Sequence, residues 1–133
     1  KLIPEAITAV HRLNQAKIPV IVVHNAAAVA RNLCSKAKVE KINQRLIKGF
    51  AQKGAFIDAL FYCPHHRDAY NPKFKLDCSW RKPQPGMLLA AAGYFHLDLS
   101  KSYLLGDQAR DISAGQAVKA KTFLIQSTSW RQF

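Results

Sequence analysis

The feature that most limits how this chain can fold is a continuous apolar run, residues 18–23, in which β-branched side chains predominate. A strand that is apolar on both sides suits a parallel sheet with both faces covered. A helical pattern precedes the run at 4–16, with Ile7, Val10 and Leu13 on one face, and another follows at 35–54. This order predicts the beginning of an α/β domain.

The same alternation continues to the end of the chain. Short apolar segments at 58–62, 102–105 and 122–125 predict three more strands, and residues 85–95 and 112–119 predict helices. Ser35 is the expected N-cap of the helix at 35–54. We therefore expect a single α/β domain, residues 1–133, with a parallel sheet that carries helices on both faces. A Cys/His loop at 63–83 follows the second predicted strand.

Composition limits the class of protein. The chain has 133 residues, 49% of them hydrophobic and 21% charged, which suits a folded domain and argues against disorder. It contains no apolar run long enough to span a bilayer and no signal peptide, so we expect no transmembrane segment and favour the cytoplasm or an organelle interior. Three cysteines do not indicate a disulfide framework, and Cys34 is expected to be a small buried hydrophobe.

The charge balance is unusual, because 20 Lys and Arg against 8 Asp and Glu give a net charge of +12. Such a charge attracts polyanions. Lys38, Lys41, Arg45 and Lys48 recur at helical spacing. They form either a solvated helix face or a non-specific contact with the phosphate backbone of a nucleic acid. No aromatic stacking platform accompanies them, so sequence-specific RNA readout is not indicated.

Polar residues follow the predicted strands, where ligands bind in parallel sheets. Gly106 and Asp107 end one strand, and Asp111 follows four residues later, so a glycine turn directs two carboxylates to a point where Mg²⁺ can bind. Alternatively, Asp107 only ends the strand and Asp111 is the N-cap of the next helix. Arg81 and Lys82, beside a proline turn, suit either a phosphate or solvent.

The loop at 63–83 carries the residue types of a zinc site. Cys63, His65 and Cys78 supply thiolate and imidazole ligands, and His66 or Asp77 would complete the four that a closed tetrahedral site requires. The alternative is a loop with incidental Cys and His residues.

Three stretches carry a resemblance to a known family: YCPHH at 62–66, RKPQPGMLL at 81–89 and SYLLGD at 102–107. Over nearly its whole length the chain resembles the histidinol-phosphate and heptose-bisphosphate phosphatase branch of the haloacid dehalogenase superfamily. The resemblance implies a Rossmann-like fold and transfer of a phosphoryl group to an aspartate, in which positioning, Mg²⁺ and electrostatic stabilisation carry the catalysis.

The resemblance also implies roles for individual residues. Lys82 matches the catalytic, charge-neutralising lysine, and Arg81 matches a contact to the substrate phosphate. Asp107 matches the catalytic-site aspartate that binds Mg²⁺, and Asp111 matches an acidic residue that supports it. The other matches are His24 and Asn25 at the phosphate-binding turn, Arg31 after that turn, and Cys63, His65 and Cys78 as three of four zinc ligands.

The chain departs from the family pattern in four places. It contains no Asp-x-Asp motif, and the first strand that would carry this motif at the centre of the sheet is lacking. His24 stands where a phosphate-holding hydroxyl is expected. The following turn, residues 25–28, has no glycine, so Cβ atoms hinder the close approach of a phosphate. Trp80 stands where the fourth zinc ligand is expected.

Two hypotheses follow. In the first, the chain is a degenerate and inactive phosphatase homologue that acts as a scaffold or binding component of a protein or ribonucleoprotein assembly, in which a partner supplies the missing strand by β-augmentation. In the second, the chain is an active Mg²⁺-dependent sugar-bisphosphate phosphatase, for heptose 1,7-bisphosphate, whose nucleophile segment lies upstream of Lys1. Zinc belongs to either hypothesis with an incomplete ligand set.

Overall fold

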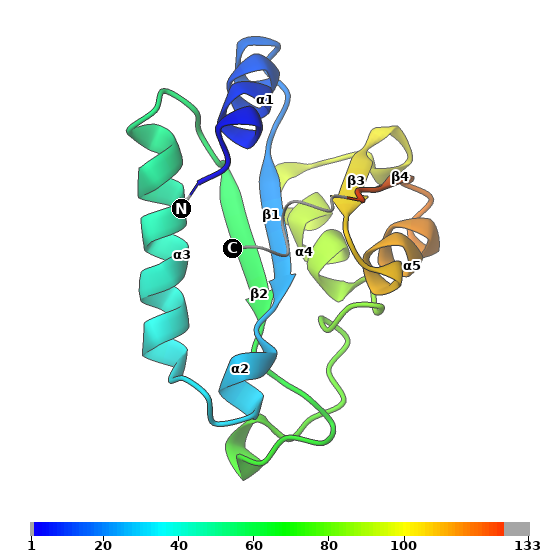
Figure 1. Ribbon diagram of the computed structural model, residues 1–133. Coiled ribbons are helices and arrows are strands. Elements are labelled where there is room, and N and C mark those ends of the chain that lie inside the picture. The colour runs from blue at the N-terminus through cyan, green and yellow to red at the C-terminus, as the bar shows by residue number, and fades with distance from the viewer. Residues whose placement is uncertain (1, 127–133) are drawn as a thin grey trace. The chain divides into compact units, whose positions relative to one another are not determined.

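The computed structural model describes residues 2–126 and has an α/β architecture with parallel strands (Figure 1). The chain divides into two compact units, Lys1–Leu76 and Asp77–Phe133. The expected parallel α/β class is confirmed, whereas a single domain stays a prediction. Within the described residues the strands form two separate two-stranded sheets, and the expected central strand is not among them.

The first unit contains two strands and three α-helices. Helix α1 spans Pro4–Gln15, strand β1 Ile21–Asn25, helix α2 Ala27–Ala30, helix α3 Lys36–Ala51 and strand β2 Ala59–Cys63, and a short 3₁₀ helix, η1, follows at Pro72–Phe74. β1 and β2 are parallel, and their register sets His24 opposite Tyr62. β1 begins later than predicted, because the Ile18 N–H still closes the last turn of α1 on the Leu13 carbonyl, 3.0 Å away.

Helix α3 anchors this unit. The Ser35 hydroxyl accepts the Lys38 N–H at 3.1 Å, which confirms the predicted N-cap. Val39 and Phe50, one near each end of the helix, belong to two different buried clusters. Ile42, three residues after Val39, is 52% exposed, because it lies about 60° around the helix from Val39 at 100° per residue.

The second unit contains the remaining pair of strands. Helix α4 spans Gly86–Phe95, the 3₁₀ helix η2 Leu99–Lys101, strand β3 Tyr103–Gly106, helix α5 Ala109–Ala117 and strand β4 Lys121–Leu124. β3 and β4 are parallel, and α5 packs on both. Gly115 permits this packing, because a Cβ there would lie 2.9 Å from Leu104 Cδ2.

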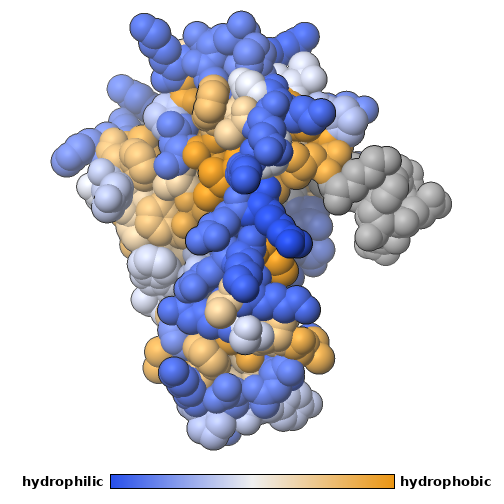
Figure 2. All heavy atoms as spheres, turned by 90° about the vertical axis from the view of Figure 1, so that its left-hand side faces the viewer, coloured by the Kyte–Doolittle hydropathy of each residue, from blue (hydrophilic) through white to orange (hydrophobic). Residues whose placement is uncertain are grey.

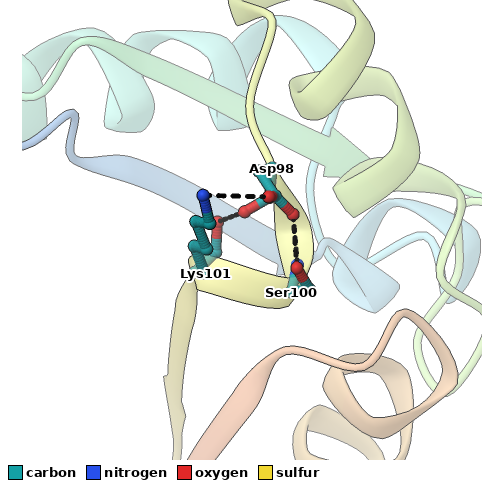
Figure 3. Close-up of polar contacts among 4 residues, drawn as sticks. Asp98, Ser100 and Lys101 are labelled. Carbon is teal, nitrogen blue, oxygen red and sulfur yellow. Dashed lines mark hydrogen bonds and ion pairs between the residues drawn. The ribbon is translucent and has the colours of Figure 1, made fainter.

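The chain approaches β3 through a turn organised by Asp98 (Figure 3). The Asp98 carboxylate accepts the Ser100 hydroxyl at 2.6 Å and the Ser100 N–H at 3.0 Å. These bonds, the hydroxyl above all, hold the pKa of Asp98 below its ordinary value. Among the described residues, no helix has the length and apolarity that crossing a membrane requires.

Candidate active site at the strand ends

The carboxyl end of β3 carries a buried ion pair. Lys82 Nζ lies 2.7 Å from Asp111 Oδ1, and the side chains are only 11% and 7% exposed. Asp111 Oδ2 accepts the Gln108 N–H at 3.1 Å, so both carboxylate oxygens hold protein donors. The carboxylate also lies against the end of the strand, since a Cβ on Gly106 would overlap Asp111. The glycine turn is therefore required by the approach of Asp111.

This geometry corrects one expectation and refines another. Asp111 is not the N-cap of α5, because Gln108 is the N-cap and Asp111 occupies the third helical position of a capping box. The box starts α5 at Ala109, three residues earlier than predicted. Asp107 is exposed at the end of β3, whereas Asp111 is occupied by Lys82 and Gln108. Asp107 is therefore the better candidate for Mg²⁺.

Turn hydrogen bonds position Arg81 and Lys82. The Arg81 N–H donates to the Cys78 carbonyl at 3.0 Å, and the Gln84 N–H donates to the Arg81 carbonyl at 2.8 Å. The Gly86 N–H closes the loop on the Ser79 carbonyl at 2.9 Å. Arg81 is half-buried in this loop. The two cations are thus presented by a segment whose backbone is fixed at both ends.

The carboxyl end of β1 is built differently. The Ala26 N–H donates to the Cys63 carbonyl at 2.8 Å, and the Ala26 side chain is buried against Val29 and Val39. The alanine turn, residues 25–28, continues directly into α2. Arg31 is exposed at the C-cap of this short helix. One backbone donor of the turn is therefore used by the protein itself.

His24 is held by two residues that sequence reasoning did not identify as part of the site. Its Nε2 lies 3.0 Å from Asn43 Oδ1, and its ring stacks on Tyr62 with centroids 5.6 Å apart. The Tyr62 hydroxyl donates to Glu40 Oε1 at 2.9 Å. Burial, followed by this bond to Glu40, raises the pKa of Tyr62 to about 12. Asn43 left a signal in the sequence, because it is a polar residue one turn after Val39 on the apolar face of α3.

Two of the predicted zinc ligands lie together in the first unit. Cys63 is buried, and its Sγ lies 3.8 Å from His65 Nδ1. Zn–S and Zn–N bonds of about 2.3 and 2.1 Å place two ligands of one tetrahedral ion about 3.6 Å apart, so the pair fits zinc. His66 instead accepts the Asp68 N–H at its Nδ1, 3.0 Å away. Cys78 lies in the second unit, and its role as a ligand stays a prediction.

The outer face of α3 is hydrophilic, as Figure 2 shows, and four of its residues are basic. Lys38, Lys41, Arg45 and Lys48 are all exposed, as expected. Lys38 and Lys48 are ten residues apart, which is about 15 Å of helix at 1.5 Å per residue. Glu40, the acid on this helix, accepts the Tyr62 hydroxyl and lies 3.7 Å from Lys36 Nζ.

Known proteins resemble this chain in sequence. The family described as HAD-hydrolase-like matches residues 79–131. D-glycero-β-D-manno-heptose-1,7-bisphosphate 7-phosphatase of Escherichia coli K12 is 32% identical over 128 residues, which cover 96% of this chain and 67% of that enzyme. The enzyme of the same name from Vibrio cholerae is also 32% identical, over 93% of this chain and 65% of its own length. The chain thus spans about two thirds of the relatives it matches.

Solved structures give the same result. A HAD-like phosphatase from Mesorhizobium loti is 32% identical with a TM-score of 0.88, and the match covers 93% of this chain and 60% of that one. D,D-heptose 1,7-bisphosphate phosphatase from B. bronchiseptica, solved with magnesium and phosphate, is 32% identical with a TM-score of 0.83 over 98% of this chain and 69% of that one. This chain belongs to the haloacid dehalogenase superfamily, in the branch of HAD-like phosphatases that contains the heptose-bisphosphate phosphatases.

Proposed function

We propose that this protein uses the phosphatase fold to bind a phosphorylated ligand of the sugar-phosphate class, together with Mg²⁺, and does not hydrolyse it. The observation that carries the proposal is the Lys82–Asp111 pair at 2.7 Å beside Gly106 and Asp107. The pair fixes a lysine at the strand end where ligands bind in α/β sheets.

The residues at the end of β3 divide the binding chemistry among them. Arg81 and Lys82 supply positive charge to a phosphate, and a guanidinium can hold two of its oxygens at once. Asp107 would hold Mg²⁺, because carboxylate oxygens are the ligands that this hard cation prefers. When bound, Mg²⁺ would neutralise charge on the phosphate oxygens. The magnesium and phosphate bound by the structural relative from B. bronchiseptica support this proposal.

Two departures from the family pattern support the absence of hydrolysis. His24 replaces the hydroxyl, and the Ala26 N–H is bonded to Cys63 instead of being offered to a phosphate. Trp80 replaces the fourth zinc ligand that the resemblance implies. The degenerate homologue is therefore the hypothesis that we carry forward, and a role within a larger assembly stays a prediction.

The proposal is tested by titrating the purified full-length protein with inorganic phosphate, with and without Mg²⁺, in a calorimeter. We expect binding that depends on Mg²⁺, and we expect Asp107→Asn to abolish that dependence. Glu5→Gln, a change at an exposed acid in α1, is the matched control and should keep it. Absence of phosphate binding at any Mg²⁺ concentration refutes the proposal.

The active-enzyme alternative is separated by a second assay. The full-length protein is incubated with heptose 1,7-bisphosphate and Mg²⁺, and released phosphate is measured. We expect none, because His24 and the alanine turn replace the groups that would hold the phosphate in position for transfer. Release that Asp107→Asn eliminates would establish the active Mg²⁺-dependent phosphatase in place of the degenerate homologue.

We propose that a zinc ion stabilises the Cys/His loop. Cys63 and His65 would hold the ion, and the Leu76 N–H bonds to the His66 carbonyl at 3.3 Å, which returns the chain to this loop two residues before Cys78. Metal analysis of the purified protein is expected to give one zinc per chain, lost in Cys63→Ser. A zinc-free protein with all three thiols reactive would exclude the site.

The basic face of α3 supports a second candidate function, non-specific binding of a nucleic acid. All four cations are exposed over one face of the helix. If each neutralises one phosphate, the affinity for duplex DNA should fall with a log–log salt slope of roughly −3 to −4. Lys41→Ala should reduce that slope by about one, whereas Lys119→Ala, an exposed lysine outside α3, should leave it unchanged. A salt-independent affinity would exclude this function.

A further inference from the structure

The loop that follows β2 packs against the amino-terminal half of α3. Phe74 of η1 packs on the buried cluster to which Val39 of α3 belongs. Lys73, next to Phe74, and Lys38, next to Val39, are both exposed. The cations of this loop and the basic face of α3 therefore arise from elements that share one cluster within the first unit.

Tyr70 places an exposed aromatic ring in the same loop. Its side chain is 77% exposed, yet its backbone is fixed. The Tyr70 N–H donates to the Ala30 carbonyl at 3.0 Å, and the Asn71 N–H donates to the same oxygen at 3.4 Å. Ala30 is completely buried at the end of α2. The ring is therefore exposed to water on a backbone that is bonded to the buried end of a helix.

Two cations start close to the backbone of Tyr70. Arg31 directly follows Ala30, the residue whose carbonyl holds the Tyr70 N–H. Lys73 follows three residues after Tyr70, and its N–H donates to the Asn71 side chain at 3.0 Å. Both cations are exposed, and within the described part of the chain neither forms an ion pair. We call Arg31, Tyr70 and Lys73 the Tyr70 surface.

The charge of the first unit favours an anionic partner for this surface. Residues 1–76 hold 13 of the 20 basic residues of the chain but only 4 of its 8 acids. An excess of this size attracts polyanions of every kind. The choice among them therefore depends on the local chemistry of the surface.

The exposed ring distinguishes between the polyanions. A base of a single-stranded nucleic acid can stack on an aromatic side chain while nearby cations contact the phosphates. A duplex keeps its bases stacked on one another, and an acidic peptide offers carboxylates but no base, so neither gains from the ring. An exposed tyrosine next to two cations therefore suits a single strand best.

We propose that the Tyr70 surface binds single-stranded nucleic acid without sequence preference, with one base stacked on Tyr70, and that the strand continues along the lysines of α3. The inference rests on the second candidate function and deepens it, because it names the form of nucleic acid that this unit binds. Tyr70 lies outside α3, so the sequence alone did not indicate an aromatic platform beside the basic face of that helix.

The role of the ring is tested with full-length protein by fluorescence anisotropy. The probes are a labelled oligodeoxyadenylate of about twelve nucleotides and its duplex with oligodeoxythymidylate. Tyr70→Ala should weaken binding of the single strand about tenfold, which is the loss expected from one stacked base, and should leave the affinity for the duplex unchanged. An equal effect on the two forms, or no effect on either, overturns the inference.

Two further variants serve as controls for the ring. Tyr70→Trp keeps an aromatic platform and should retain the affinity of the wild type for the single strand. Tyr94→Ala removes a tyrosine of equal exposure, 77%, from the second unit and should leave both affinities unchanged. If Tyr70→Ala does not fold, NMR of the wild type decides. The Tyr70 ring protons should move upfield when the single strand is added, and unchanged shifts overturn the inference.

The phosphate contacts are tested by the dependence of affinity on salt. Arg31→Ala should reduce the log–log salt slope for the single strand by about 0.7, because one phosphate loses its cation. Tyr70→Ala should leave this slope unchanged, since an uncharged ring releases no counterion. Arg12→Ala, at an exposed arginine of α1, is the matched control and should also leave it unchanged. A slope that falls as much in Tyr70→Ala as in Arg31→Ala overturns the inference.

The inference and the function on which it rests can fail separately. If the wild type binds neither the single strand nor the duplex, the second candidate function fails and the inference fails with it. If both forms bind and Tyr70→Ala binds them as the wild type does, only the inference fails. Polyglutamate is the third probe. If Tyr70→Ala weakens its binding as much as that of the single strand, the surface recognises an acidic protein instead, and the inference is overturned.

Discussion

Polar side chains gather at the carboxyl ends of both β3 and β1, but the protein holds them in different ways. At β3 a lysine and an aspartate pair directly, and a glycine admits the carboxylate. At β1 an imidazole is held by an amide and an aromatic ring, and alanines fill the turn. A family motif lies at the end of β3, and the departures that the sequence predicts lie at the end of β1.

The difference separates stability from catalysis. Removing either partner of a buried ion pair leaves the other charge uncompensated, so Lys82 and Asp111 are required for folding whether or not the protein catalyses a reaction. A hydroxyl and a glycine turn that only hold a ligand carry no such requirement. The family motifs at the end of β3 can be kept for stability alone, so they are weak evidence for hydrolysis. The replacement of ligand-holding residues at the end of β1 is stronger evidence that hydrolysis is lost.

The largest expected effect comes from Lys82→Met. This change leaves Asp111 buried and unpaired, and it should lower the free energy of unfolding by about 3–5 kcal/mol. Urea denaturation measures it. Lys101→Met is the matched control, because the Lys101 side chain is 84% exposed and its pair with Asp98 spans 3.9 Å, so it should cost no more than about 0.5 kcal/mol. Equal costs for the two lysines would contradict the comparison.

The next effect tests the glycine of the same strand end. Gly106→Ala places a Cβ against Asp111 and should lower the free energy of unfolding by about 1–3 kcal/mol through overpacking. Gly93→Ala is the control, because a Cβ at this position of α4 meets no atom within 4 Å. It should raise stability by about 0.5–1 kcal/mol. Thermal denaturation of the two variants would refute the close approach if they shift in the same direction.

Local features of the fold could be predicted from the sequence, and long-range contacts could not. Apolar periodicity located the four longer helices and the four strands of the described residues to within a few residues, because burial of one face is a local pattern, but it did not predict the short helix α2. It placed α5 late, because the capping box of Gln108 and Asp111 depends on hydrogen bonds that hydropathy does not carry. Asn43 and Tyr62 are distant in sequence from His24, so only the strand register and the packing of α3 bring them together.

A smaller effect is expected at Tyr62 of β2, whose ring stacks on His24 of β1. The pKa of Tyr62 is raised to about 12, so the neutral phenol is favoured in the folded state, and its contribution to stability is complete below pH 10 and lost as the pH rises through 12. Absorbance titration should show one tyrosine that ionises last, and Tyr62→Phe should remove it. Glu40→Gln should lower this pKa, because it removes the carboxylate. An unchanged titration in Glu40→Gln would mean that burial alone shifts Tyr62.

The smallest effect is expected at Asp98, before the amino end of β3. It tests whether a carboxylate stabilises the fold through its burial at the carboxyl end of the strand or through its charge alone. Asp98 is an exposed acid whose pKa is lowered chiefly by the Ser100 hydroxyl. A lowered pKa means that its contribution to stability is present above the ordinary value of 3.8 and is lost as the pH falls through the folded value. Ser100→Ala should therefore raise the pKa of Asp98, measured from its carboxyl ¹³C shift. The urea midpoints of the wild type and Asp98→Ala should differ slightly near neutral pH and converge in acid. Asp98→Ala should lower the free energy of unfolding much less than Lys82→Met does. Equal losses would show that exposed Asp98 and buried Asp111 stabilise the fold equally, so that burial does not distinguish the two carboxylates.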